Sequence, residues 1–115
     1  MAAHNELGKL GEDMAAKCLL DKGFRIVCRN WHYGRKEVDI IAMDADVLVF
    51  VEVKTRVREM SPNDLISYNK VRYLEEAAEA YIRDSGHCGD ARFDIVKVTK
   101  KRGEYEIVHI PAAFR

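Results

Sequence analysis

Two apolar, β-branched segments joined by a very short turn constrain the fold of this 115-residue chain more than any other feature. The segments cover residues 37–41 (EVDII) and 49–54 (VFVEVK), and this composition between turn residues is typical of β-strands. The connection at 44–46 is short enough only for a hairpin. If its last two residues form a two-residue loop, Asp44 lies opposite Val47 and the register of the whole pair is fixed.

This register predicts a cluster of charged side chains on one face of the hairpin. Asp39 lies opposite Glu52, Glu37 lies opposite Lys54, and side chains alternate with period two, so all four share a face. Two carboxylates opposite each other repel, and the pair destabilises a sheet unless something compensates. A divalent cation such as Mg²⁺ compensates, because it takes oxygen ligands from one or two carboxylates. The hairpin therefore predicts a metal site.

The composition is that of an ordinary soluble protein, with 48% hydrophobic and 33% charged residues and a formal net charge of zero. The length predicts one domain over residues 1–115. Neutrality argues against a protein that coats nucleic acid non-specifically. We find no membrane-spanning apolar run and no signal peptide, and the three cysteines have no metal-ligand spacing. We therefore expect a cytoplasmic protein without a membrane partner.

The remaining elements follow from helical spacing, strand alternation and turn residues. They are a helix over 6–20 with Asn5 as its N-cap, a strand over 24–31, a helix after Pro62 that Ser67 caps and that ends near residue 84, and strands over 91–99 and 104–110. The order of helix, three strands, helix and two strands predicts an α/β fold, with a central mixed sheet flanked by helices.

The polar, aromatic segment 30–36 has two interpretations. It is either an exposed hairpin loop with anchoring aromatic residues or a nucleic-acid contact, in which Arg35 and Lys36 bind phosphates and a ring stacks on a base. Trp31 suits both interpretations, because it could equally pack inward. Arg92 and Asp94, on the fourth strand, are expected to form a structural ion pair.

Asp39, followed by Glu52-Val53-Lys54 at the end of an apolar strand, resembles the D…(D/E)-x-K signature of the restriction-endonuclease-like superfamily, whose core has the order αβββαβ. More closely, the chain resembles the YraN family of small bacterial proteins, relatives of archaeal Holliday-junction resolvases. The matching segments are 8–12 (GKLGE), 37–42 (EVDIIA), 48–56 (LVFVEVKTR), 92–94 (RFD), and Lys70 with Arg72. Lys36 departs from the family, which usually has Gly there.

The resemblance implies a metal-dependent endonuclease that hydrolyses DNA phosphodiester bonds, with branched, Holliday-junction-like DNA as one expected substrate. Asp39 and Glu52 would hold Mg²⁺, with Mn²⁺ as a substitute, and Glu12 would complete the metal site. Lys54 would polarise the attacking water or stabilise the transition state. Glu37 faces Lys54 in the proposed register and would orient it.

The resemblance also implies that Lys70 and Arg56 contact phosphates of the nucleic acid. Symmetric cutting of two strands would favour a homodimer. Each charge also has a structural alternative: strand carboxylates are often solvated, and Glu12 could simply favour its helix N-terminus. Two other functions stay open for the chain, namely a non-catalytic nucleic-acid-binding module that retains the nuclease fold, and a protein-interaction domain.

Overall fold

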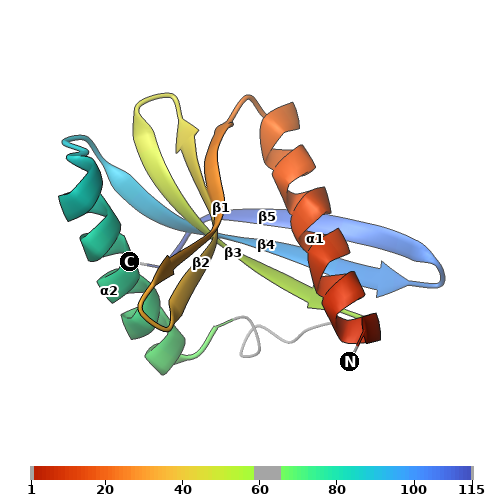
Figure 1. Cartoon of the computed structure of the whole chain (residues 1–115). Helices are drawn as coiled ribbons and strands as arrows, with labels where there is room; N and C mark the ends of the chain where they lie inside the picture. Colours follow the sequence, from red (N-terminus) through yellow and green to blue (C-terminus); the bar gives the residue numbers. More distant parts are fainter. Residues whose placement is uncertain (1, 59–65, 115) are drawn as a thin grey trace.

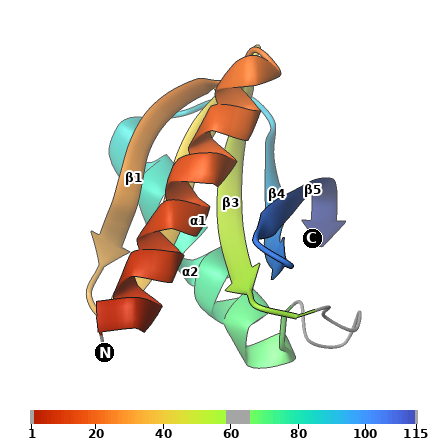
Figure 2. The same ribbon diagram turned by 90° about the vertical axis from the view of Figure 1, so that its right-hand side faces the viewer.

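A five-stranded sheet separates two helices in the computed structural model, which describes residues 2–58 and 66–114 and, for residues 2–5, the backbone alone. Helix α1 (Ala2–Asp21) covers one face and α2 (Tyr68–Ser85) covers the other (Figures 1 and 2). The strands are β1 (Arg25–Tyr33), β2 (Lys36–Asp44), β3 (Val47–Arg56), β4 (Ala91–Lys101) and β5 (Glu104–Phe114). The expected αβββαβ core is confirmed, and β5 follows it.

The strands lie in their order along the chain, β1-β2-β3-β4-β5, and the sheet is mixed, as expected. The β3–β4 pair is parallel because α2 connects the two strands as a crossover, whereas the other pairs are antiparallel. The predicted hairpin register is confirmed from Asp44 opposite Val47 to Ile40 opposite Val51, where the pairing of β2 with β3 ends, so the expected pairs of Asp39 with Glu52 and of Glu37 with Lys54 are not part of the ladder. Ala45 has the positive φ of +54° that a tight two-residue hairpin turn requires.

Each face of the sheet forms its own hydrophobic core with one helix. The core under α1 contains Ala15, Leu19, Ile40, Val49, Val51, Val96 and Val98, and the core under α2 contains Val38, Ile41, Leu48, Phe50, Leu74 and Ala77. Coverage on both faces explains why β2 and β3 are apolar at successive positions rather than alternating. No helix in the described part of the chain is long and apolar enough to cross a membrane.

The element boundaries correct two predictions and confirm one. Helix α1 begins at Ala2, so Asn5 lies within the helix and its assignment as the N-cap is wrong. Strand β1 continues to Tyr33, so the expected polar turn shrinks to Gly34 and Arg35. The cap of α2 is confirmed, because the Ser67 Oγ accepts a hydrogen bond from the Lys70 backbone N–H at 3.1 Å. The turn expected around residue 62 lies outside the described residues.

A glycine brings α1 close to the end of β3. Gly11 is buried, and a Cβ at this position would lie 2.0 Å from the Thr55 Oγ1. Any other residue would have to displace Thr55 or the helix, because non-bonded heavy atoms pack about 3.5 Å apart or more. Gly11 therefore positions its neighbour Glu12 beside the charged end of the central hairpin.

Candidate active site

Strands β2 and β3 separate at one end of the sheet, and we call this point the fork. Their last residue pair is Ile40 with Val51; beyond it the β1–β2 hairpin bends toward α2, while β3 continues past α1 (Figure 1). Asp39 is the first residue of β2 beyond that pair, and its Oδ2 accepts a hydrogen bond from the Val53 backbone N–H at 2.8 Å. A carboxylate thus satisfies a strand donor that β2 no longer pairs.

The alternation of side chains breaks at the fork. Val38 and Ile40 are two residues apart, yet Val38 packs under α2 and Ile40 packs under α1. On β1, Asn30 lies opposite Asp39 and has a left-handed φ of +54°. The strict alternation that placed all four charged side chains on one face is therefore wrong, because the β1–β2 ribbon twists as a separate pair once β3 leaves it.

Asp39 and Glu52 nevertheless meet at the fork. The Glu52 side chain is buried, and burial followed by the negative charge of Glu52 raises the pKa of Asp39 from 3.8 to about 8, against the lowering effect of the Val53 N–H. Two carboxyl groups this close cannot both ionise cheaply in a dehydrated site. Their arrangement favours either a shared proton or a bound cation.

Two lysines approach the same oxygen of Glu52. The Lys54 Nζ lies 3.1 Å and the Lys70 Nζ 3.7 Å from the Glu52 Oε2. Lys54 comes from β3 and Lys70 from the first turn of α2, where its ammonium also lies 4.2 Å from the ring centroid of Tyr73. Lys70 therefore belongs to the centre of the site rather than only to its rim.

Glu12 and Glu37 lie near the carboxylate pair but have other partners. Glu12 accepts a hydrogen bond from the Asn30 Nδ2 at 3.2 Å and lies 3.7 Å from Arg29. Burial raises the pKa of Glu12, Arg29 lowers it, and the charge of Glu37 raises it, so the two acids share one electrostatic environment. Glu37 forms an ion pair with His32 at 3.0 Å rather than with Lys54, so the structure does not place it as the group that orients this lysine.

The donor set fits Mg²⁺ with two protein ligands. In the described part of the chain, no three Asp, Glu, His or Cys side chains lie close enough together to hold one ion. Mg²⁺ is usually bound through one or two carboxylates, with water and substrate phosphate as its other ligands, so Asp39 and Glu52 suffice for it. A cage made only of protein side chains is not what this geometry offers.

A family model described as "Uncharacterised protein family UPF0102" matches residues 11–98. The chain belongs to this family. UPF0102 proteins of Phocaeicola vulgatus and Flavobacterium johnsoniae are 42% and 44% identical to it, over 99% of this chain and 96% and 98% of theirs. The Rhodococcus jostii UPF0102 protein is 44% identical over 97% of this chain and 99% of its own. The resemblance to the YraN family is thereby confirmed.

A solved structure, described as Pyrococcus furiosus SfsA in complex with Ca²⁺, has a TM-score of 0.45 and 16% sequence identity with this UPF0102 chain. The similarity covers 94% of this chain and 63% of that one.

The other predicted phosphate-contacting residues lie on the two segments that lead away from the fork. Arg35 occupies the tip of the β1–β2 hairpin, and Arg56 ends β3, where its Nη1 donates to the Thr55 carbonyl at 2.8 Å. Lys36 is already paired, 3.2 Å from Glu76 of α2. Arg35 and Arg56 are exposed, and Lys36 mainly fastens the hairpin to the helix.

Sequence reasoning missed two residues that shape the site. The Tyr73 hydroxyl accepts a hydrogen bond from the Glu37 backbone N–H, and the Lys70 ammonium lies over the Tyr73 ring in a cation–π contact. Its position three residues after Lys70 on a helix was a usable signal, because such pairs are neighbours. Asn30 also carried a signal, since Asn is one of the few residues that adopt left-handed backbone conformations readily.

Away from the fork, Arg92 and Asp94 form the expected ion pair, at 2.9 Å. Asp94 is fully buried and also accepts hydrogen bonds from His109 at 2.7 Å and from the Ala112 backbone N–H at 3.0 Å. Arg92, His109 and Ala112 border a cavity of about 520 Å³ that Lys22 also lines. Because the polar groups satisfy one another, this network ties the end of β5 to β4.

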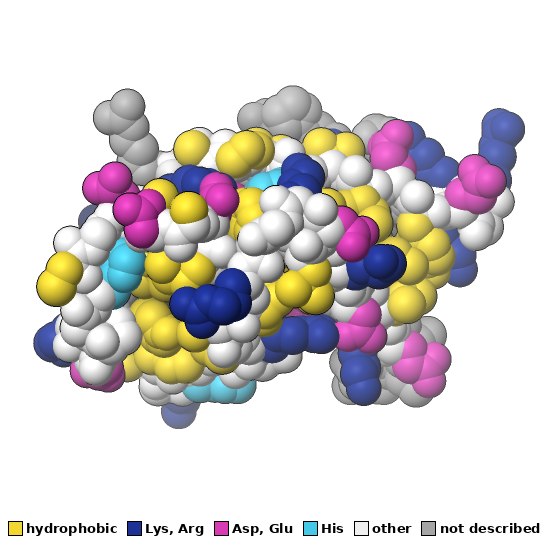
Figure 3. All heavy atoms as spheres, turned by 90° about the horizontal axis from the view of Figure 1, so that it is seen from above, with side chains coloured by type: hydrophobic (Ala, Val, Ile, Leu, Met, Phe, Trp, Pro, Cys, Tyr) yellow, Lys and Arg dark blue, Asp and Glu magenta, His cyan; other side chains and the backbone are white. Residues whose placement is uncertain are grey.

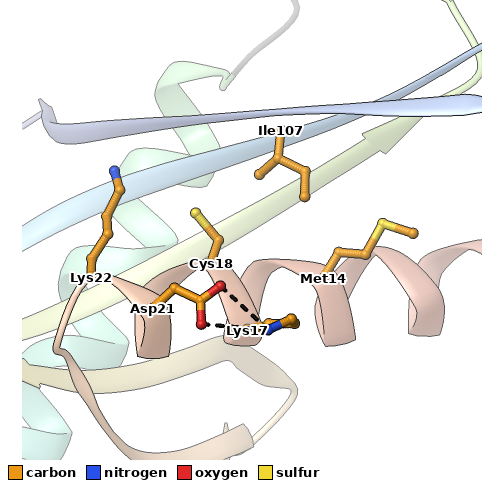
Figure 4. A pocket seen from close by; sticks show the side chains of 6 residues that line it. All are labelled: Met14, Lys17, Cys18, Asp21, Lys22 and Ile107. Carbon is orange, nitrogen blue, oxygen red and sulfur yellow. Dashed lines mark hydrogen bonds and ion pairs between the residues drawn. The ribbon is translucent and has the colours of Figure 1, made fainter.

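A second cavity of about 380 Å³ lies between α1 and β5 (Figure 4). Met14, Cys18 and Ile107 supply apolar lining, and Lys17 and Asp21 form an exposed ion pair at 3.4 Å across one turn of α1. Neither cavity resembles the fork, where a buried carboxylate lies beside a second acid and two lysines.

Proposed function

We propose that this protein is a Mg²⁺-dependent nuclease that hydrolyses phosphodiester bonds of DNA in the cytoplasm. One observation carries the proposal: Asp39, with its pKa raised to about 8, adjoins the buried Glu52, and Lys54 lies 3.1 Å from that glutamate. Fixing two repelling acids in a dehydrated position costs stability, and such arrangements are concentrated at functional sites. A bound cation would offset the charge of the two carboxyl groups, and a phosphate would offset the charge of the neighbouring lysines.

The roles of the residues follow from their positions. Asp39 and Glu52 would hold Mg²⁺, or Mn²⁺ in its place, and a bound ion of this kind would supply positive charge to a phosphoryl oxygen and lower the pKa of its bound water. The Lys54 ammonium, 3.1 Å from the Glu52 Oε2, would polarise the attacking water or donate to a phosphate oxygen in the transition state. Lys70 would remain beside the phosphate as a second positive charge.

DNA is the proposed substrate because of the D…E-x-K pattern and the arginines around the fork. The resemblance to junction resolvases adds branched DNA to the substrates that need testing. Symmetric cutting of such a molecule would require two copies of the chain related by a two-fold axis.

A non-catalytic nucleic-acid-binding module is the second candidate, and one observation favours it. Lys54 and Lys70 already offset the charge of Glu52, so the fold can keep this glutamate without a metal. In that case the fork would bind phosphates through its lysines and arginines and would not cut.

The test is cleavage of end-labelled DNA by the whole chain, with a four-way junction, a duplex and a single strand offered separately in Mg²⁺, Mn²⁺ or EDTA. We expect cutting with either metal and none in EDTA. Asp39→Asn and Lys54→Gln should each lower the rate by roughly 100-fold or more, because each removes a group aimed at the developing charge. Asp46→Asn, in the exposed β2–β3 turn, is the matched control and should cut like the wild type.

A folded wild-type protein that cuts none of these substrates in either metal would overturn the nuclease proposal. Salt-dependent binding retained by that protein would then favour the second candidate, because phosphate contacts release counterions. Cutting that persists unchanged in Asp39→Asn would also refute the assignment of the fork.

A further inference from the structure

The fork end of the molecule carries exposed tyrosines and arginines on three segments. The β1–β2 hairpin and the first turns of α2 are adjacent there, because Lys36 and Lys70 both lie over the ring of Tyr73, 5.7 and 4.2 Å from its centroid. Tyr33 lies at the tip of the β1–β2 hairpin, Tyr68 begins α2, and Arg56 ends β3. We propose that this surface binds nucleic acid with unpaired bases, and that Tyr33 and Tyr68 stack on those bases beside the cutting site. The proposal rests on the nuclease function and deepens it by naming the substrate class.

Tyr33 is held ready for stacking. Its ring lies parallel to that of Trp31, with an interplanar angle of 4° and centroids 6.4 Å apart. Trp31 is itself fixed edge-on against Tyr81 of α2, with centroids 5.3 Å apart. Tyr33 nevertheless remains 42% exposed. A ring that is already ordered loses little conformational entropy when a base stacks on it, so binding keeps more of the contact energy.

Tyr68 contributes almost nothing to the core. It is 73% exposed at the first position of α2, and its hydroxyl accepts a long hydrogen bond of 3.4 Å from Arg72 one turn later. Two residues after Tyr68 comes Lys70, whose ammonium lies 3.7 Å from Glu52. The Tyr68 ring therefore lies next to the Arg72 guanidinium, on the helix turn that brings Lys70 to Glu52. Single-strand-binding proteins combine aromatic stacking with positive charge in the same way.

The positive charge at this end is available for phosphates. Among the described residues, no carboxylate forms an ion pair with Arg35, Arg56 or Arg72, whereas Arg29 pairs with Asp13 at 2.8 Å. The opposite end looks different. Figure 3 shows that end from above, with Lys and Arg side chains interspersed among Asp, Glu and hydrophobic side chains. Arg35, Arg56 and Arg72 can therefore contact phosphates without first breaking an ion pair with a described carboxylate.

The spacing suits a strand whose bases are not paired. Tyr33 pairs with Lys36, which precedes Asp39 by three residues of β2, so the backbone positions of Tyr33 and Asp39 lie about 10 Å apart along the strand at 3.4 Å per residue. That is roughly three nucleotides at the rise of a stacked strand. In an intact duplex the base faces are covered by their neighbours, so only unpaired or splayed bases can reach a tyrosine.

Binding is measured without cutting, by fluorescence anisotropy of a labelled oligothymidine and of a blunt duplex of equal length in EDTA. We expect the wild type to bind the single strand more tightly. Tyr33→Ala and Tyr68→Ala should each weaken single-strand binding by about 5- to 100-fold, the range for one base–aromatic stack, and should leave duplex binding within about twofold. Tyr33→Phe and Tyr68→Phe keep the ring and should bind like the wild type.

Leu20→Ala is the matched control, because Leu20 is 54% exposed on α1 away from the fork residues named above. Tyr68→Ala is expected to leave the protein folded, because the exposed side chain of Tyr68 does not pack in the core. Equal affinity for the two DNAs, or unchanged single-strand binding by both alanine variants, would overturn the inference. If such a protein still cuts DNA with Mg²⁺, the nuclease function survives without it. A protein that binds neither DNA in EDTA and also cuts neither with Mg²⁺ overturns both proposals, and is the result expected of a protein-docking surface.

Discussion

Replacing Asp39 by asparagine should stabilise the metal-free protein while it destroys the proposed activity. Asparagine keeps the shape of the side chain and an oxygen that can accept the Val53 N–H, which Asp39 binds at 2.8 Å. It removes the acid whose ionisation burial and Glu52 oppose. Active sites often trade stability for function in this way.

The sign and size of the effect follow from the pKa. In the unfolded chain Asp39 releases its proton near pH 3.8, whereas the folded chain retains the proton until the pKa of about 8. Between these values the folded state binds more protons, so the free energy of unfolding of the wild type falls as the pH rises. The slope reaches at most about 1.4 kcal/mol per pH unit, which sets an upper bound of roughly 4 kcal/mol at pH 7.

Urea unfolding in EDTA, followed at pH 4, 5.5, 7 and 8.5, measures this difference. We expect Asp39→Asn to match the wild type at pH 4 and to exceed it by a growing margin that levels off above about pH 8. Asp46→Asn, in the exposed turn, should track the wild type at every pH. A difference between Asp39→Asn and the wild type that does not change with pH, or a mutant that is less stable at pH 8.5, would refute the assigned ionisation.

Further outcomes are expected for two glycines of α1, for Asp94 and for Mg²⁺ binding. Gly11→Ala should lower the free energy of unfolding, measured by urea unfolding, by about 1 to 3 kcal/mol because its Cβ would overlap Thr55. Gly8→Ala lies on the same helix with open space around it, so it should raise the free energy of unfolding by up to about 1 kcal/mol. Asp94→Ala should cost about 3 to 5 kcal/mol in the same assay, because the buried His109 loses its acidic partner and Arg92 keeps only Asp44. Mg²⁺ at 100 times its dissociation constant should stabilise the wild type by about 2.7 kcal/mol in calorimetry, and an unchanged melting temperature would contradict the metal site.

Much of the fold was predictable because it depends on local pattern. The apolar hairpin, the turn at 44–46 and the cap at Ser67 each follow from residues within a few positions of one another, and the structure confirms all three. The ion pair between Arg92 and Asp94 was equally accessible, since residues two apart on a strand share a face. The assignment of Asn5 as a cap failed because helix-forming alanines before it extend the helix.

The geometry of the site was only partly predictable. The sequence brought Asp39 and Glu52 together through the hairpin register, and the structure keeps them close. The predicted register also paired Glu37 with Lys54. In the structure the strands separate at the fork, so Glu37 forms an ion pair with His32 and Lys54 forms one with Glu52. An alternation rule assumes continuous pairing, and it fails where a strand changes partners.

The sequence by itself determined the elements, their order, the register of the central hairpin and the acids and lysines at its end, because all of these depend on neighbours along the chain. The tertiary structure alone decided that β2 leaves β3 beside Asp39, that Lys70 reaches Glu52 from α2, and that Gly11 lets α1 approach β3. These features depend on contacts between segments distant in sequence. Their physical origin is the packing of two helices against opposite faces of one twisted sheet.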